Sequence, residues 1–455
     1  MTRAEVAVTL TFVTTVLLAS CGGGGDADGS AGGGAGGGAC LASGVSDTGV
    51  HAPPTNGPFP YSPPGSWLPG QAGFPAVGDS YIDPVFGTTV RRITDEFSGQ
   101  SFSDIYATNG WWNADASLLV HRTSTDHIAI NAATAAVVQT GVPGGTGSSE
   151  TSFDPVDPDV WYFYQNDELW QFRVTTGATA LLKKFPAAAD NSLGGSVDWI
   201  DRSGRYFLVA YNGALHIWDR TTDKLYANSI PFDALLSGGW AGISPDGNYV
   251  ITATGDFTSY LINHESRTLS TTGIMFWNLC GDHGDLISAS DGRTYLVTFE
   301  CNNQAAVYRV DVTIQHTGLG DISDVAQQQA DNVMLIDTDF DDSGHFSCVS
   351  SGPNRDWCFV SFEARDDSFT DQDWRPYKQE IVAVQVVPPF AVRRLAHHRS
   401  RSTDCPTCPF GGYYHQPRLS ASWDGRRVAF ASNFGFDAGT VEYADIYVLD
   451  SSCAP

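Results

Sequence analysis

A short acidic turn recurs seven times along this chain of 455 residues. The clearest copies read Ser-Pro-Asp-Gly at 244–247, Ser-Asp-Gly at 290–292 and Ser-Trp-Asp-Gly at 422–425, and each leads into an apolar, strand-like stretch. The turn aspartates are Asp115, Asp157, Asp201, Asp246, Asp291, Asp342 and Asp424. The first five are 42, 44, 45 and 45 residues apart, and the last two intervals are 51 and 82. A repeat of about 45 residues is typical of β-propeller blades.

The composition agrees with short strands joined by many turns. Only 17% of residues are charged, whereas the chain has 48 glycines and 12% aromatic residues, and helical periodicity is nearly absent. Asp-Gly supplies the positive φ that a tight hairpin needs. We therefore predict an all-β fold, a single seven-bladed propeller of four-stranded antiparallel blades. Two stacked β-sandwiches are the alternative for this length, and the near-constant spacing argues against them.

The two ends of the chain are predicted to close the ring. Residues 88–94 (Thr-Thr-Val-Arg-Arg-Ile-Thr) read as a strand without an Asp-Gly hairpin of its own. The last repeat offers only three good strands, at 418–422, 427–432 and 445–450. We expect the early strand to complete this last blade, because their pairing removes two exposed sheet edges. The propeller should then span 76–455.

The N-terminus resembles that of a bacterial lipoprotein. Residues 6–18 are largely apolar and follow Arg3. Residues 18–21 read Leu-Ala-Ser-Cys, which resembles the lipoprotein cleavage box: the signal is cut before the cysteine, and the cysteine then carries lipid. We expect a signal peptide at 1–20, lipid on Cys21, and a Gly/Pro-rich tether and irregular leader over 21–75. The protein should then be exported and anchored to a bacterial membrane, facing the periplasm or the cell surface. An ordinary secretion signal is the alternative.

The other eight cysteines indicate disulfides, because their number is even and the chain is expected to be exported. The Cys-Pro-Thr-Cys run at 405–408 has the spacing of a thioredoxin-type motif, but it lies in a Pro/Gly-rich loop and is interpreted as a staple. The simplest pairing joins neighbours: Cys280–Cys301, Cys348–Cys358, Cys405–Cys408 and Cys40–Cys453.

The charge balance limits the partners. The chain has 51 acidic and 25 basic residues, a formal net charge of −26. Nucleic acid and anionic lipid surfaces require clustered Lys and Arg, so neither is expected as a partner, and the membrane is contacted only through the lipid anchor. We expect a monomer whose partner is a saccharide or another envelope protein.

One local basic cluster stands out in this acidic chain. Residues 393–402 read Arg-Arg-Leu-Ala-His-His-Arg-Ser-Arg-Ser, and residues 413–418 read Tyr-Tyr-His-Gln-Pro-Arg, just before the last blade. His283 lies at a comparable position before the turn at Asp291. Loops that precede inner strands meet at the mouth of the central channel, the usual ligand site of a propeller. We therefore predict the ligand site there.

The layout resembles that of the oligogalacturonate lyases, seven-bladed propellers that cleave uronate oligosaccharides by β-elimination. The similarity covers most of residues 83–450. It includes Arg-Ile-Thr at 92–94, the histidine ahead of the fifth turn and the basic loop before the last blade. Residues 417–425 (Pro-Arg-Leu-Ser-Ala-Ser-Trp-Asp-Gly) are close to the family's Pro-His-x-Ser-x-x-Pro-Asp-Gly. The resemblance implies a saccharide ligand and a lyase reaction.

The resemblance also implies a divalent metal, manganese or calcium. The family's ligands are a histidine before an inner strand and a Gln/His/His set before the last blade. His283, His398 and Gln416 are the candidates here. Arg418 stands where the family has a histidine, and arginine cannot ligate a metal because it stays protonated. An acidic run at 337–342 resembles a calcium loop but lacks its glycine and closing glutamate, so we interpret it as the turn at Asp342.

β-Elimination of a uronate needs a base beside the carboxylate and positive charge to hold the enolate that forms. The candidate bases are His283, His398 and His415. Arg399 or Arg418 could supply the charge, and Tyr414 could protonate the leaving oxygen. For each histidine the alternative is a buried ring hydrogen-bonded to backbone, and for Arg418 it is a structural ion pair.

Two functions remain open. The first is an envelope-anchored propeller that binds, and cleaves by β-elimination, a uronate-containing saccharide at the channel mouth. The second is a non-catalytic propeller that serves as an interaction scaffold in the cell envelope.

The lipid anchor can be tested by one substitution. Cys21→Ser removes the thiol that would carry lipid, so the variant is expected in the soluble fraction while the parent protein sediments with membranes. Cell fractionation followed by immunoblotting measures the distribution. Unchanged membrane association of the variant would contradict the lipoprotein interpretation.

Overall fold

The computed structural model divides the chain into two compact units, Met1–Gly37 and Gly38–Pro455. The residues that the structure describes all belong to the second unit. They are 44–52, 74–95, 110–122, 127–144, 151–189, 193, 198–232, 239–279, 283–300, 306–316, 325–338, 342–364, 374–400, 416–434 and 444–451. None of the helices in this part of the chain is long and apolar enough to cross a membrane.

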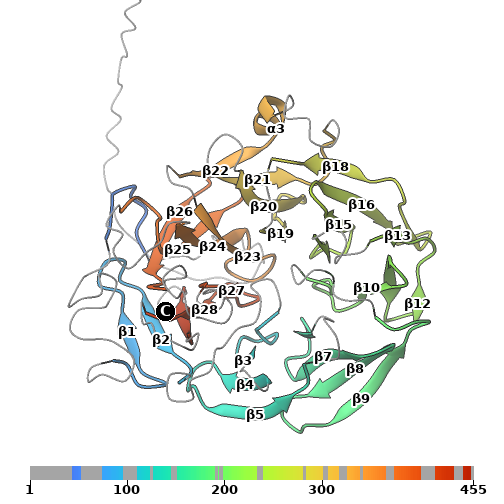
Figure 1. Cartoon of the computed structure of the whole chain (residues 1–455), viewed down its shortest axis with the longest axis horizontal. Helices are drawn as coiled ribbons and strands as arrows, with labels where there is room; N and C mark the ends of the chain where they lie inside the picture. The colour runs from blue at the N-terminus through green and yellow to red at the C-terminus, as the bar shows by residue number, and fades with distance from the viewer. Residues whose placement is uncertain are drawn as a thin grey trace, which may run out of the picture. The chain divides into compact units, whose positions relative to one another are not determined.

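The second unit is a β-propeller of seven small antiparallel sheets arranged in a ring, which confirms the predicted fold (Figure 1). We number the blades 1 to 7 in chain order. Blade 1 holds β3 (Leu118–Arg122), β4 (His127–Asn131) and β5 (Val137–Val142), and blade 2 holds β6 (Ser152–Phe153), β7 (Val160–Gln165), β8 (Glu168–Arg173) and β9 (Thr179–Lys184). Blade 3 holds β10 (Tyr206–Tyr211), β11 (Ala214–Asp219), β12 (Lys224–Leu225) and β13 (Ile230–Pro231). Single bridges to Trp112 and Ile200 complete the inner edges of blades 1 and 3.

The remaining blades follow the same plan. Blade 4 holds β14 (Trp240–Ile243), β15 (Tyr249–Ala253), β16 (Phe257–Asn263), β17 (Thr268–Leu269) and β18 (Ile274–Trp277). Blade 5 holds β19 (Gly284–Ser288), β20 (Thr294–Glu300), β21 (Ala306–Asp311) and β22 (Val333–Asp337), with the short helix α3 (Val325–Asp331) before β22. Blade 6 holds β23 (Asp342–Cys348), β24 (Trp357–Ala364), β25 (Glu380–Gln385) and β26 (Val392–His397). Blade 7 holds β27 (Ser420–Ala421), β28 (Arg427–Ser432), β29 (Asp445–Asp450), β2 (Thr89–Arg92) and β1 (Ser80–Ile82).

The recurring turn joins the innermost strand of a blade to the next strand. In blade 4 the Ser244 hydroxyl accepts hydrogen bonds from the backbone N–H groups of Asn248 and Tyr249, at 3.1 and 2.9 Å. Gly247 follows at φ +73°, a conformation that glycine adopts without strain. In blade 3 the Asp201 carboxylate takes the place of the serine hydroxyl. The motif is therefore a side-chain oxygen that holds the hairpin, followed by a residue that tolerates positive φ.

One of the seven predicted turns is wrong. Asp342 begins β23, the inner strand of blade 6, instead of following an inner strand. The hairpin of this blade lies at 349–356, where Asp356 bonds back to Val349 and Gly352 has φ +73°. This hairpin lacks Asp-Gly, so the acidic run before β23 was mistaken for it. Placing the turn at 349–356 makes the last two intervals more alike, but both stay longer than 45 because blades 5 and 6 have longer connections between their strands.

The predicted closure of the ring is confirmed. β2 pairs antiparallel with β29, and Val90 lies opposite Leu449 in this register. β1 adds a fifth strand outside β2, which the sequence did not predict. The predicted disulfide Cys348–Cys358 joins β23 to β24. The other proposed cysteine pairs and Cys21 lie outside the described residues.

The closing strands can be tested against the stability of the whole ring. Leu449 is fully buried opposite Val90, so Leu449→Ala should lower the free energy of unfolding by about 2–5 kcal/mol in one cooperative transition. Ile82→Ala, in β1 where the side chain is 64% exposed, should change it by no more than about 0.5 kcal/mol. Denaturant unfolding followed by circular dichroism measures both. A separate early transition in the Leu449 variant would show that closure is not coupled to the ring.

Candidate functional site

Two histidines and a glutamate from neighbouring blades meet near the inner edges of their sheets. His283 directly precedes β19, and its ring stacks on that of His345 in β23, with centroids 4.4 Å apart and planes 26° apart. The His345 Nδ1 lies 3.4 Å from the Glu363 Oε1 near the end of β24. We call His283, His345 and Glu363 the His–Glu cluster.

Burial sets the protonation of the cluster. It lowers the pKa of His345 to about 3, so this imidazole is neutral at pH 7. Burial raises the pKa of Glu363 to about 8, against a smaller opposing effect of His283, so this carboxyl is largely protonated at pH 7. The cluster therefore places a neutral imidazole beside a neutral carboxylic acid. A proton donor and a proton acceptor lie together without an unpaired charge in the interior.

Sequence reasoning found His283 but missed His345 and Glu363. The cause is the misplaced turn at Asp342, which put residues 343–348 in the strand after the hairpin instead of in the inner strand. With β23 as the inner strand, His345 and His283 come from adjacent inner edges. Gly344 permits the tight pairing of β23 with β24, because a Cβ there would meet the Ser361 carbonyl oxygen at 1.9 Å. Only glycine lets β23 approach β24 so closely.

His398, a predicted base and metal ligand, is fully buried next to this cluster. Its Nε2 donates to the Phe362 carbonyl at 2.9 Å, and its Nδ1 accepts from the Ser400 backbone N–H at 3.1 Å. Burial lowers the pKa of His398 to about 3. Both ring nitrogens thus have backbone partners, the arrangement considered above as the alternative to catalysis.

The residues before the last blade are only partly described. Arg418 is buried and lies within 3.5 Å of the Gln416 Oε1, and both residues precede β27 as expected. Tyr414 and His415 lie outside the described residues. Among those described, no group of three or more His, Cys, Asp or Glu side chains is arranged to hold a metal ion. Metal binding by His283, His398 and Gln416 stays a prediction.

Part of the basic run at 393–402 lies in or just after β26, the outer strand of blade 6 (Figure 1). Arg394 is fully buried and makes two bonds to the Glu380 carboxylate, at 2.7 and 2.6 Å. Arg399, with φ 61°, lies 4.0 Å from Asp83 and is also buried. The positive charges of Arg394 and Arg399 therefore face nearby carboxylates, Glu380 and Asp83. We had expected these charges at the channel mouth, where they would meet a ligand.

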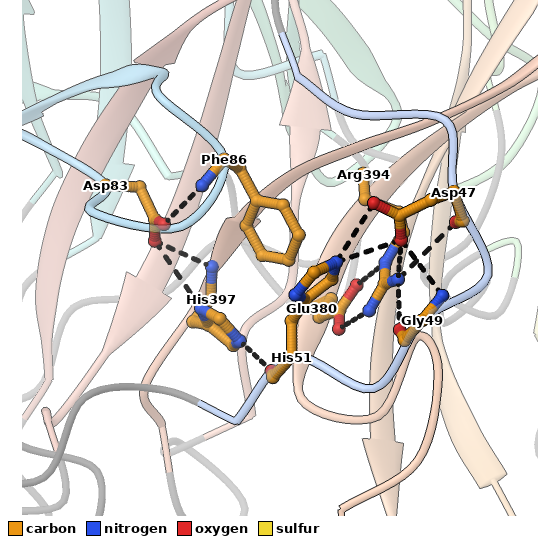
Figure 2. Close-up of polar contacts among 8 residues, drawn as sticks. All are labelled: Asp47, Gly49, His51, Asp83, Phe86, Glu380, Arg394 and His397. Atoms are coloured by element: carbon orange, nitrogen blue, oxygen red, sulfur yellow. Dashed lines mark hydrogen bonds and ion pairs between the residues drawn. The ribbon is translucent and has the colours of Figure 1, made fainter.

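Residues 44–52 of the leader, which we call the strap, lie beside the Arg394–Glu380 pair (Figure 2). Val45 forms two backbone hydrogen bonds with Arg394, at 3.1 and 2.8 Å, so residues 44–52 lie against β26. The Arg394 guanidinium also reaches the Asp47 carboxylate at 3.1 Å. Farther along, the His397 Nε2 donates to the His51 carbonyl at 2.7 Å. The strap therefore ties the leader to the rim of blade 6.

Comparison with known proteins gives a fold and no family. No protein-family model and no curated protein matches the sequence. The oligogalacturonate lyase of Vibrio parahaemolyticus superposes with a TM-score of 0.51 at 12% identity, covering 82% of this chain and 96% of that one. An oligogalacturonate lyase in complex with manganese gives 0.52 at 14% identity, covering 82% and 95%. At such identities the similarity establishes the propeller fold alone, as the resemblance predicted.

The Arg394–Glu380 pair provides a test of the blade 6 rim. Glu380→Gln removes the buried one of the two carboxylates that face the Arg394 guanidinium, which should lower the free energy of unfolding by about 3–5 kcal/mol. Asp47→Asn changes a partner of the same guanidinium that is half exposed, so it should cost no more than about 1 kcal/mol. Thermal and denaturant unfolding measure both. Equal effects of the two changes would contradict the structure.

Proposed function

We propose that this protein binds a uronate-containing saccharide at the His–Glu cluster and cleaves it by β-elimination. The observation that carries the proposal is the stacking of His283 on His345 beside Glu363, at the inner edges of two neighbouring blades. General acid–base chemistry needs a donor and an acceptor held close together in a site that limits water. The shared fold with two oligogalacturonate lyases supports the choice of substrate.

The reaction assigns one task to each side chain. His283 takes the proton from the carbon next to the uronate carboxylate, and the electron pair of this C–H bond forms the new double bond. The bond from the neighbouring carbon to the glycosidic oxygen breaks, and Glu363 supplies the proton for this oxygen. His345 holds the ring of His283 in place by stacking. We assign the positive charge that stabilises the enolate to Arg418, which precedes β27 in the neighbouring blade 7. No step is assigned to a metal, because the described residues form no metal-binding group.

We also propose that the protein acts in the cell envelope. Its leader contains the lipoprotein-like box at 18–21, and a glycine-rich stretch separates this box from the strap at 44–52. Such a tether would hold the propeller near a membrane while leaving it free to meet an extracellular or periplasmic saccharide.

The second candidate is a non-catalytic scaffold. It is favoured by the buried ring of His398, whose two nitrogens bind backbone, and by the substitution of Arg418 for a family metal ligand. A scaffold would bind saccharide or protein without forming an unsaturated product.

The lyase activity can be measured with uronate oligosaccharides, through the ultraviolet absorbance of the new carbon–carbon double bond. The parent protein should form this product, and His283→Ala should reduce its rate by a factor of about 10²–10⁴, because a positioned base contributes this much. Glu363→Gln, which keeps the shape but not the acidic proton, should slow the reaction similarly.

His216→Ala is the matched control, since His216 lies on β11 of blade 3, away from the cluster, and the activity should not change. Thermal unfolding of each variant shows whether it is folded. Binding of the oligosaccharide without any unsaturated product would favour the scaffold. Full activity of a folded His283→Ala variant would overturn the assignment of the base.

A further inference from the structure

The side-chain hydroxyl of Thr298 is bonded to the main chain of His283, a member of the His–Glu cluster. Thr298 is a fully buried residue of β20, and its Oγ1 donates a hydrogen bond to the His283 carbonyl oxygen at 2.7 Å. The reaction proposed above gives Thr298 no task. The bond therefore joins a side chain that the reaction does not use to the residue that serves as its base.

The bond lies where the pairing of two strands begins. The first pair of β19 and β20 joins Gly284 to Thr298, and His283 comes directly before it. The Thr298 hydroxyl thus extends the contact between the two strands by one residue, from Gly284 to His283. The base is held by the rigid inner edge of blade 5 although it lies outside the strand itself.

Gly284 leaves the space that the Thr298 side chain occupies. A Cβ at position 284 would lie 3.2 Å from the Thr298 Cβ and 3.0 Å from the Val297 carbonyl oxygen, which is closer than ordinary van der Waals contact. The glycine therefore lets β19 and β20 approach each other closely. This approach brings the hydroxyl within reach of the carbonyl group of the preceding residue.

The hydrogen bond restrains the imidazole through the main chain. The carbonyl group of His283 is attached to its Cα, so a carbonyl oxygen held at 2.7 Å also limits the direction of the Cα–Cβ bond. The ring then keeps the place in which it stacks on His345. A base must lie within hydrogen-bond reach of the proton that it removes, and an error of about 1 Å in its position can slow a reaction about 100-fold.

We propose that Thr298 is a positioning residue for the base: its hydroxyl holds the main chain of His283 so that the imidazole stays stacked on His345 and aligned with the substrate. This inference rests on the proposed lyase reaction and identifies the group that fixes its base. Thr298 itself contacts neither the substrate nor the reacting atoms.

Two substitutions separate the hydroxyl of Thr298 from its methyl group. Thr298→Val replaces the hydroxyl with a methyl group of similar size and should lower kcat for uronate oligosaccharides at least about tenfold, with KM changed less than about twofold. Thr298→Ser keeps the hydroxyl and should retain at least about half of kcat. Thr298→Ala removes the hydroxyl without placing a methyl group against the carbonyl oxygen, and it replaces the valine variant if that one does not fold.

Nuclear magnetic resonance of the histidine rings measures the position of His283 without any reaction. Comparison of the full-length protein with His283→Ala assigns the His283 ring signals. Stacking on His345 shifts these signals, because each ring lies in the ring-current field of the other. In Thr298→Val they should move toward the position of an unstacked imidazole, and in Thr298→Ser they should stay in place. If the parent protein forms no unsaturated product, the proposed function fails, and these signals still decide whether Thr298 positions the ring.

Ser259→Ala is the matched control. The buried Ser259 hydroxyl of blade 4 donates to the Val312 carbonyl oxygen at 2.6 Å, so this change removes a bond of the same kind outside the cluster. It should leave kcat and the His283 signals unchanged. Unchanged signals in the folded Thr298→Val or Thr298→Ala variant overturn the proposal, as does a loss of stacking without a loss of rate in an active protein. It is equally overturned if Thr298→Ser behaves like Thr298→Val, because packing of the methyl group is then the cause, or if Ser259→Ala has the same effect.

Discussion

The backbone pairing of β2 with β29 is the interaction on which the rest of the molecule depends. Each blade exposes two faces that a four-stranded sheet cannot cover alone, so every blade needs a neighbour on both sides. An open row of blades would leave two such faces and two sheet edges in water. Pairing an N-terminal strand with the last strand of the chain closes the row. The inner edges of all blades are thereby brought around one axis, and the His–Glu cluster lies near two of these edges.

Two buried guanidinium groups tie segments that are far apart in sequence. Arg92 of the closing strand bonds to Asp445 at 2.7 Å, and Arg394, which pairs with Glu380 inside blade 6, also bonds to Asp47 of the leader. A buried guanidinium is tolerated only with its carboxylate in place, so each pair rejects alternative positions of the segments that it joins. The apolar contacts between blades are less specific, because many registers bury similar side chains. The charged pairs thus specify the connections that the repeat itself leaves open.

The repeated turn predicts the hairpins of six blades, because hairpin chemistry is local and can be read from a few residues. The strand-like stretch at 88–94 predicts the closure of the ring. Where a hairpin uses other residues, as at 349–356, the prediction fails. The inner strand of blade 6 was then assigned incorrectly, so His345 and Glu363 were not recognised as site residues. β1 and the strap at 44–52 were missed for a different reason. β1 is only three residues long, too short to show a clear strand pattern. The strap pairs with Arg394, which no local pattern relates to residues 44–52. The basic run at 393–402 is visible in the sequence, but its carboxylate partners are not. Glu380, Asp47 and Asp83 come from three other segments of the chain.

The strap at 44–52 has a mechanical consequence. The chain passes through it before it reaches β1 and β2, so tension applied at the N-terminal end acts first on the Val45–Arg394 hydrogen bonds and the ion pair of Asp47. The pull must strip the strap from the rim of blade 6 before it can peel the closing strands from β29. The strap therefore bears the load first, and the closing strands carry no tension while its contacts with blade 6 remain intact.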